Sequence, residues 1–139
     1  MRGLILAIAL LLALPSYSEE VVVNVDTGLP KVVSMDELRD YFLLKKSHYP
    51  NGTVVQVFLF NKDTQVTRNF LLNVLHISSS AYFDMMDGYA ATGRSNLPVI
   101  VESDTRMVIS IAIHKGGIGI IRDAAYAANL TNIKIIEVK

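Results

Sequence analysis

The chain has 139 residues, with 13 basic and 13 acidic side chains and no cysteine. This balanced charge gives no electrostatic basis for nucleic-acid binding, and the lack of cysteine excludes disulfides, thiol nucleophiles and cysteine-based zinc sites. The length is sufficient for one domain with one hydrophobic core.

The first 18 residues have the layout of a secretory signal peptide. Arg2 supplies a positive start, and residues 4–14 form an unbroken apolar run that Pro15 breaks. Ser16 and Ser18 then place small residues at the −3 and −1 positions of a cut before Glu19. The run is too short for a spanning helix, which needs about 20 apolar residues. We therefore expect a signal peptide over 1–18, with retention as an anchor as the alternative, and one domain over 19–139. That domain is expected to be periplasmic, without membrane insertion after cleavage.

The first half of this domain has clear strand and helix signals. The run "VVVNV" (21–25) predicts a strand that is buried on both faces, because its apolar residues do not alternate. The letters "SMDE" form a capping box before a helix over 35–45. A turn at Asn51-Gly52 then leads into a second buried strand over 54–60.

The second half repeats this alternation. Apolar spacing and serine caps predict helices over 66–76, 78–89 and 103–113. The second of these is expected to end at Gly88 or Gly93. "AAYAAN" (124–129) suggests a loose helical turn, and strands are predicted over 115–121 and 132–138. Strands alternating with helices indicate an α/β fold: a mainly parallel or mixed sheet with helices on both faces.

The sequence offers little for catalysis or metal binding. His48, His76 and His114 are far apart and never adopt a metal-binding spacing, so each is expected at a helix end or on the surface. No nucleophile lies in a recognisable pattern with a base. We therefore expect neither an enzyme nor a cofactor.

The stretch "NKDTQVTRNF" (61–70) is the best candidate site. It places a strand-to-helix loop at the carboxyl end of a strand, where open α/β sheets bind ligands. Free backbone N–H groups there attract anions, and Thr64, Thr67 and Arg68 add further donors. The alternative is that Asp63 or Thr64 only caps the helix and Arg68 is a surface charge.

The order of several segments resembles a known family. "VVVNVDTGLPKVVSMDELRDYFLLKKSHYPNGTVVQV", "TRNFLLNVL", "ATGRSNLP" and "GGIGII" follow one another as in the exported phosphate-binding-protein-like family, which is related to the substrate-binding components of phosphate ABC transporters. The resemblance covers essentially the whole of 19–139. It implies a single lobe of a type II periplasmic binding protein-like fold, whereas full members clamp their ligand between two lobes.

The resemblance also implies which residues would form the site. The family's phosphate loop matches residues 65–68, which retain Thr67 and Arg68 but replace its serine and glycine with Gln65 and Val66. Leu44 stands where the family has a glycine. The expected ligand-binding residues are Thr64, Gln65, Thr67 and Arg68, with Asp26, Thr27, Gly28 and Arg94 as second-rank contributors.

Two functions remain open at this stage. The first is a periplasmic solute-binding-protein-like domain that binds phosphate or another small oxyanion weakly. The second is a non-enzymatic scaffold that kept the fold, lost its ligand and contacts a periplasmic protein partner.

Overall fold

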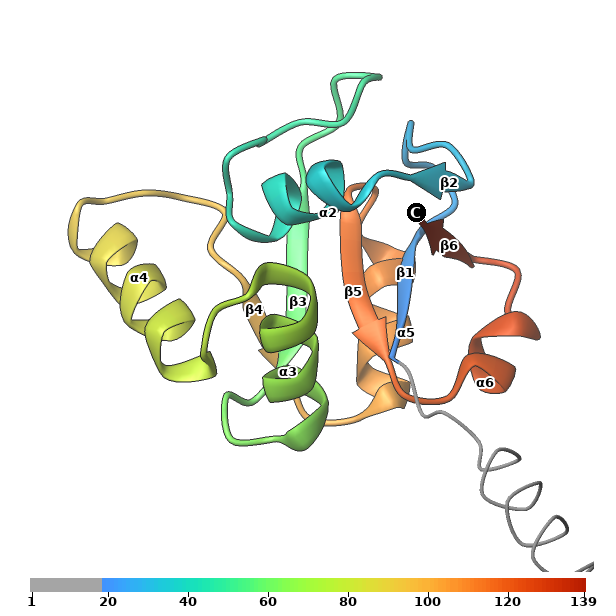
Figure 1. Ribbon diagram of the computed structural model, residues 1–139. Helices are drawn as coiled ribbons and strands as arrows, with labels where there is room; N and C mark the ends of the chain where they lie inside the picture. The colour runs from blue at the N-terminus through green and yellow to red at the C-terminus, as the bar shows by residue number, and fades with distance from the viewer. Residues whose placement is uncertain (1–18) are drawn as a thin grey trace, which may run out of the picture.

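The computed structural model describes residues 19–139, so the expected signal peptide over 1–18 lies outside the described residues. Six strands form one sheet in the order β2-β6-β1-β5-β3-β4 (Figure 1). Their bounds are β1 Glu20–Asn24, β2 Val32–Val33, β3 Gln56–Phe60, β4 Val99–Val101, β5 Gly117–Ile121 and β6 Ile133–Val138. The expected α/β fold is confirmed.

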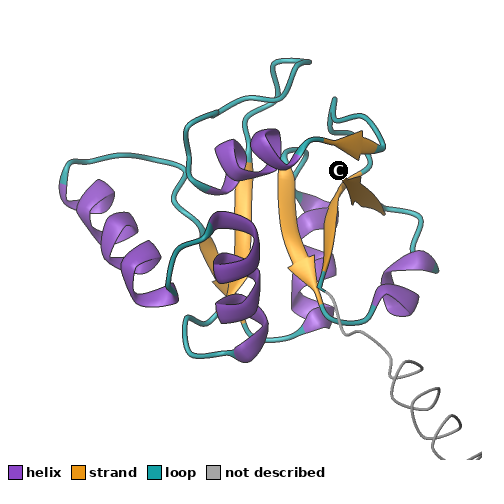
Figure 2. Cartoon of the chain, viewed as in Figure 1, coloured by secondary structure: helices purple, strands orange, loops and turns teal. Residues whose placement is uncertain are grey.

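Helices cover both faces of this sheet. They are α2 Met35–Phe42, α3 Gln65–Phe70, the π-helix η1 Leu71–Leu75, α4 Ser79–Ala91, α5 Asp104–Ile113 and α6 Ala124–Ala128. Figure 2 shows α2 and α3 on the viewer's side of the sheet and α5 on the far side. Within the described part of the chain, no helix is both long enough and apolar enough to span a bilayer.

The sheet is mixed. β3 is parallel to β4 and β5, and β2 is parallel to β6. β1 is antiparallel to both of its neighbours, so Glu20 lies opposite Ile121 and Val23 lies opposite Ile118. The end of β1 therefore lies beside the starts of β5 and β3. This register decides which candidate residues can meet.

The core forms where the sequence places its apolar runs. Val22, Val23 and the whole of β5 are buried, as expected for strands covered on both faces. Aromatic side chains link the helices above the sheet, with the rings of Phe42 and Phe70 4.8 Å apart. The Tyr82 hydroxyl donates to the carbonyl of Phe42 at 2.8 Å, which fixes α4 to the end of α2.

Local capping signals set the helix starts correctly. The hydroxyls of Ser34, Ser78 and Ser103 accept backbone N–H groups at 3.1, 3.1 and 3.2 Å at the starts of α2, α4 and α5. α2 ends at Phe42, earlier than expected, because Leu44 adopts a left-handed conformation with φ of 59°. α4 continues through Gly88, and Gly93 follows its end with φ of 80°.

Three features were not predicted. β2 and β4 have only two and three residues, too few for a periodic signal. The helix expected over 66–76 changes to π-helical geometry at Leu71 and ends at His76, which is left-handed with φ of 55°.

Candidate functional site

Residues 61–68, called here the 61–68 corner, comprise the loop that follows the carboxyl end of β3 and the first turn of α3. Asn61 organises this turn. Its carbonyl accepts the Thr64 backbone N–H at 3.0 Å and the Thr64 hydroxyl at 2.7 Å, and its side-chain oxygen accepts the Asp63 N–H at 3.1 Å. The 61–68 corner is therefore a closed local turn, located where the sequence predicted a strand-to-helix loop.

Thr64 caps α3 with its own side chain. Its oxygen accepts the Thr67 N–H at 3.4 Å while its hydrogen is donated to Asn61. Thr64 therefore acts as the helix cap, which was the alternative interpretation of this residue. Its hydroxyl proton is already donated to Asn61 and is not free for a ligand.

Thr67 points into the protein. It is fully buried, and its hydroxyl donates to the carbonyl of Phe60 in β3 at 3.0 Å. The sequence placed this hydroxyl among the ligand donors. Its burial corrects that expectation, because a side chain with no solvent access positions α3 against the strand and cannot meet a ligand from outside.

Other donors at the corner remain available. Among the described residues, none accepts a hydrogen bond from the backbone N–H of Gln65 or Val66, which open the first turn of α3. Arg68 is exposed, and its guanidinium lies 3.5 Å from the side-chain oxygen of Gln65. No ion pair involves Arg68 within residues 19–139. Because Arg68 is exposed, an anion held by these groups would stay in contact with solvent.

Arg122 is a neighbour that sequence reasoning missed. It follows β5, and its guanidinium lies 5.6 Å from the ring centre of Phe60, at the end of β3. Its Nε is also 3.7 Å from a carboxylate oxygen of Asp104, at the start of α5. The carboxyl edge of the parallel strands thus carries both signs of charge. Parallel pairing of β3 and β5 brings Arg122 here. The signal available in the sequence was that Arg122 directly follows the strand expected over 115–121.

Asp26, Thr27 and Gly28 lie at the opposite end of the sheet. Because β1 is antiparallel to β5, residues that follow β1 lie beside the start of β5. The backbone N–H of Asp26 donates to the side-chain oxygen of Asn24 at 2.8 Å. Thr27 is buried, and Gly28 lies so close to Asn51 that an added Cβ would fall 2.6 Å from it. These three residues do not join the 61–68 corner.

Arg94 does not join it either. α4 begins at the corner, where the hydroxyl of Ser79 donates to the carbonyl of Lys62 at 2.7 Å. It then runs for 13 residues, about 20 Å at the helical rise, before reaching Arg94. There the Arg94 guanidinium donates to the carbonyl of Leu44. The eight expected site residues are thus distributed over three places.

The histidines lie apart from one another. His76 and His114 end η1 and α5, and all three histidines are exposed. In the part of the chain that the structure describes, no three metal-ligating side chains gather at one point.

Comparison with solved structures identifies the fold. An ABC-type phosphate transport receptor from Vibrio cholerae superposes with a TM-score of 0.61 at 12% identity, covering 86% of this chain. PstS from Borrelia burgdorferi gives 0.63 at 10% identity and 88% coverage. This chain has the fold of phosphate ABC transporter binding proteins.

A third structure with this phosphate-binding-protein fold contains bound phosphate. It comes from Clostridium perfringens, is described as a phosphate ABC transporter substrate-binding protein, and gives a TM-score of 0.60 at 10% identity and 89% coverage. This chain spans less than half of each solved chain, from 45% to 47%. No family model matches the sequence, and no curated protein matches it significantly. The solved neighbours are binding proteins rather than enzymes.

Proposed function

We propose that this chain is a non-enzymatic, periplasmic, solute-binding-type domain that contacts phosphate or another small oxyanion weakly at the 61–68 corner. The observation that carries the proposal is a set of donors at the carboxyl end of β3, two of which have no acceptor among residues 19–139. These are the N–H groups of Gln65 and Val66, with the exposed guanidinium of Arg68 beside them. Such donors suit an oxyanion because each N–H or guanidinium group donates to one of its oxygens.

The same geometry argues for low affinity. The hydroxyls of Thr64 and Thr67 already donate to backbone carbonyls. Val66 adds a side chain where a glycine would allow closer approach to the backbone, and the exposed Asp63 repels an anion. Tight sites bury about 70–90% of their ligand. A corner open on one side therefore binds weakly, unless a partner chain supplies a second wall.

The scaffold function remains the second candidate, and a specific observation favours it. α5 exposes Ile109 and Ile113 to solvent at 50% and 74%, on the face opposite α3. Exposed apolar side chains on one helix suit a protein contact. A stoichiometric partner that co-purifies from the periplasm, together with an unresponsive 61–68 corner, would favour this function.

Amide NMR during a phosphate titration tests the proposal. We expect saturable shifts at residues 64–68 with millimolar phosphate or sulfate, at ionic strength held constant with sodium chloride. The substitution Arg68→Gln should weaken the response about tenfold, because it removes a charge-assisted contact. Arg106→Gln, which removes another exposed arginine near the start of α5, is the matched control and should change nothing. Unchanged spectra at millimolar phosphate would rule out oxyanion binding.

A further inference from the structure

A second candidate site lies at the other end of β3. A cavity of about 340 Å³ opens between the segment that follows α2 and the segment that follows α4. Leu44 and Val55 line it with apolar groups, and Lys46, Ser47, His48 and Arg94 line it with polar ones. Its volume is at the lower end of the range for small-molecule sites. The proposed corner and this cavity are separated by the length of α4.

The ionisable side chains that line this cavity are all basic. Two permanent cations, Lys46 and Arg94, line it together with a histidine, and its lining includes no carboxylate. Within residues 19–139, neither cation is in an ion pair. An anion entering the cavity thus meets two positive charges that no carboxylate of the described chain neutralises.

Arg94 is held in position rather than free in solvent. Its Nη2 donates to the carbonyl of Leu44, and its guanidinium carbon lies 4.4 Å from the ring centre of Tyr89. These contacts leave other N–H groups of the Arg94 guanidinium available to a ligand. A guanidinium that is already oriented loses less entropy when it binds an oxyanion.

The opposite wall is also fixed. The carbonyl of Asp40 accepts the backbone N–H groups of Lys45 and Lys46 at 2.8 and 3.2 Å. The Ser47 hydroxyl oxygen lies 2.8 Å from Nδ1 of His48, which orients the imidazole. The backbone of the segment that carries Lys46 is therefore held in place, and the His48 ring beside it is oriented.

Backbone strain is concentrated around the same cavity. Leu44 and Asn96 both line it, and both adopt left-handed conformations, with φ of 59° and 61°. Residues other than glycine rarely adopt this conformation, and those that do are often found at ligand sites. Asparagine tolerates this conformation better than leucine does, so Leu44 is the position at which the fold maintains an unfavourable backbone on the cavity wall.

We propose that this cavity binds a small organic phosphate monoester. Arg94 and Lys46 would bind the doubly charged phosphoryl group. Leu44 and Val55 line the cavity with the 8% and 4% of their surface that stays exposed, and so provide a small apolar surface for the organic group. Inorganic phosphate leaves this surface uncovered, and a carboxylate carries only half the charge.

Phenyl phosphate is the probe for the test, followed by amide NMR of the protein. We expect saturable shifts at residues 44–48 and 94–96, with an affinity about tenfold higher than for inorganic phosphate or benzoate. Shifts at 64–68 report the 61–68 corner separately, so failure at one site does not imply failure at the other. Absent shifts at 44–48 and 94–96, or equal affinity for all three probes, would overturn the proposal.

Two substitutions sharpen the test. Lys46→Gln changes an exposed side chain and should weaken phenyl phosphate binding about tenfold without loss of fold. Arg94→Gln should weaken it at least as much, with the intact amide spectrum of the free protein as the check on folding. Lys115→Gln, on an exposed lysine outside the cavity, is the matched control and should bind as the parent does. Full binding by Lys46→Gln would contradict the assignment.

Discussion

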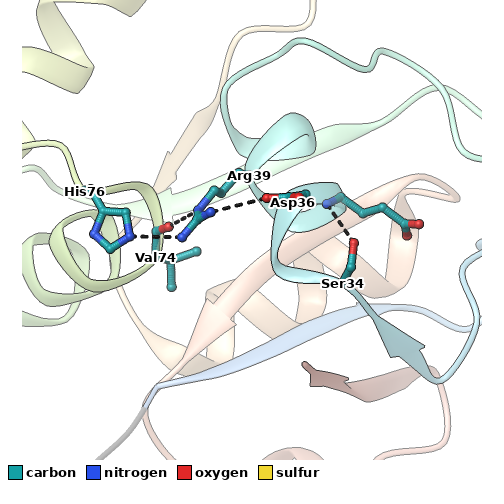
Figure 3. Close-up of polar contacts among 6 residues, drawn as sticks. Ser34, Asp36, Arg39, Val74 and His76 are labelled. Atoms are coloured by element: carbon teal, nitrogen blue, oxygen red, sulfur yellow. Dashed lines mark hydrogen bonds and ion pairs between the residues drawn. The ribbon is translucent and has the colours of Figure 1, made fainter.

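Arg39 Nε donates to the main-chain carbonyl of Val74 at 2.6 Å and so ties α2 to the last turn of η1 (Figure 3). The same guanidinium lies 3.3 Å from Asp36 and 2.9 Å from Nε2 of His76. A guanidinium only donates, so Nε2 of His76 acts as the acceptor in this contact. One side chain thus closes the helix end at which the backbone becomes left-handed.

The first prediction concerns this contact. Arg39→Ala should lower the free energy of unfolding by about 1.5–3 kcal/mol, because a hydrogen bond from a charged group is lost and the Val74 carbonyl loses its partner. Urea denaturation followed by circular dichroism measures the change. Arg106→Ala is the matched control and should alter stability by less than about 0.5 kcal/mol. Equal effects of the two substitutions would show that the contact contributes nothing.

The second prediction separates structure from ligand contact at Thr67. Thr67→Val keeps the shape but removes the hydroxyl that donates to Phe60, so stability should fall by about 1 kcal/mol. The response of residues 64–68 to phosphate should persist, since the buried hydroxyl never meets the anion. Thr67→Ser, which keeps the donor, is the control for the missing hydrogen bond. Loss of the phosphate response in the valine variant alone would assign the hydroxyl to the ligand.

The third prediction contrasts two glycines. A Cβ at Gly116 would lie 1.7 Å from the carbonyl oxygen of Val54, at the start of the cross-strand contact between β3 and β5. Gly116→Ala should therefore destabilise the protein by more than about 3 kcal/mol or prevent folding. Gly88 lies within α4 with nothing within 4 Å of an added Cβ. Gly88→Ala should stabilise the protein by about 1 kcal/mol, as measured by thermal unfolding.

The fourth prediction is an alkaline loss of stability. Burial raises the pKa of both Tyr82 and Tyr49. For Tyr49, the charge of Tyr41 raises the pKa further, as a smaller cause. The folded protein thus keeps these protons where the unfolded chain releases them. The stabilisation is complete below the ordinary tyrosine pKa of about 10 and is lost as the pH rises beyond it.

Unfolding by urea at pH values from 8 to about 11 measures this slope. Tyr82→Phe should cost about 1 kcal/mol at neutral pH, where the bond to the Phe42 carbonyl is lost. The same variant should show a smaller decline above pH 10 than the parent. A parallel decline in both proteins would show that Tyr82 does not contribute to it.

Local sequence signals predicted most elements because their causes are local. Ser34 and Ser103 cap helices through atoms three residues away, so a short window contains the whole interaction. β2 and β4 were missed because their strand geometry comes from pairing with β6 and β3, far away in the sequence. The antiparallel setting of β1 is likewise decided by residues near the other end of the chain.

The candidate site was predictable in position but not in chemistry. The strand-to-helix change at residues 61–68 follows from patterning, and the structure has it there. The direction of each hydroxyl does not follow, because Thr67 turns inward only when β3 lies beneath it. Asp26 and Arg94 were grouped with the corner because a linear motif carries no information on which end of a sheet a segment reaches.

The central place of β1 has a consequence for biosynthesis. β1 is translated before the other five strands of this sheet, yet its partners are β5 and β6. Val22 can therefore pair with Gly119 and Ile135 only after both of these strands have been synthesised. Until β5 and β6 have been synthesised, the nascent chain carries an apolar segment with both hydrogen-bonding edges open. Such a segment is prone to aggregate, and shielding by a holdase chaperone would suit it until the last strand closes the sheet.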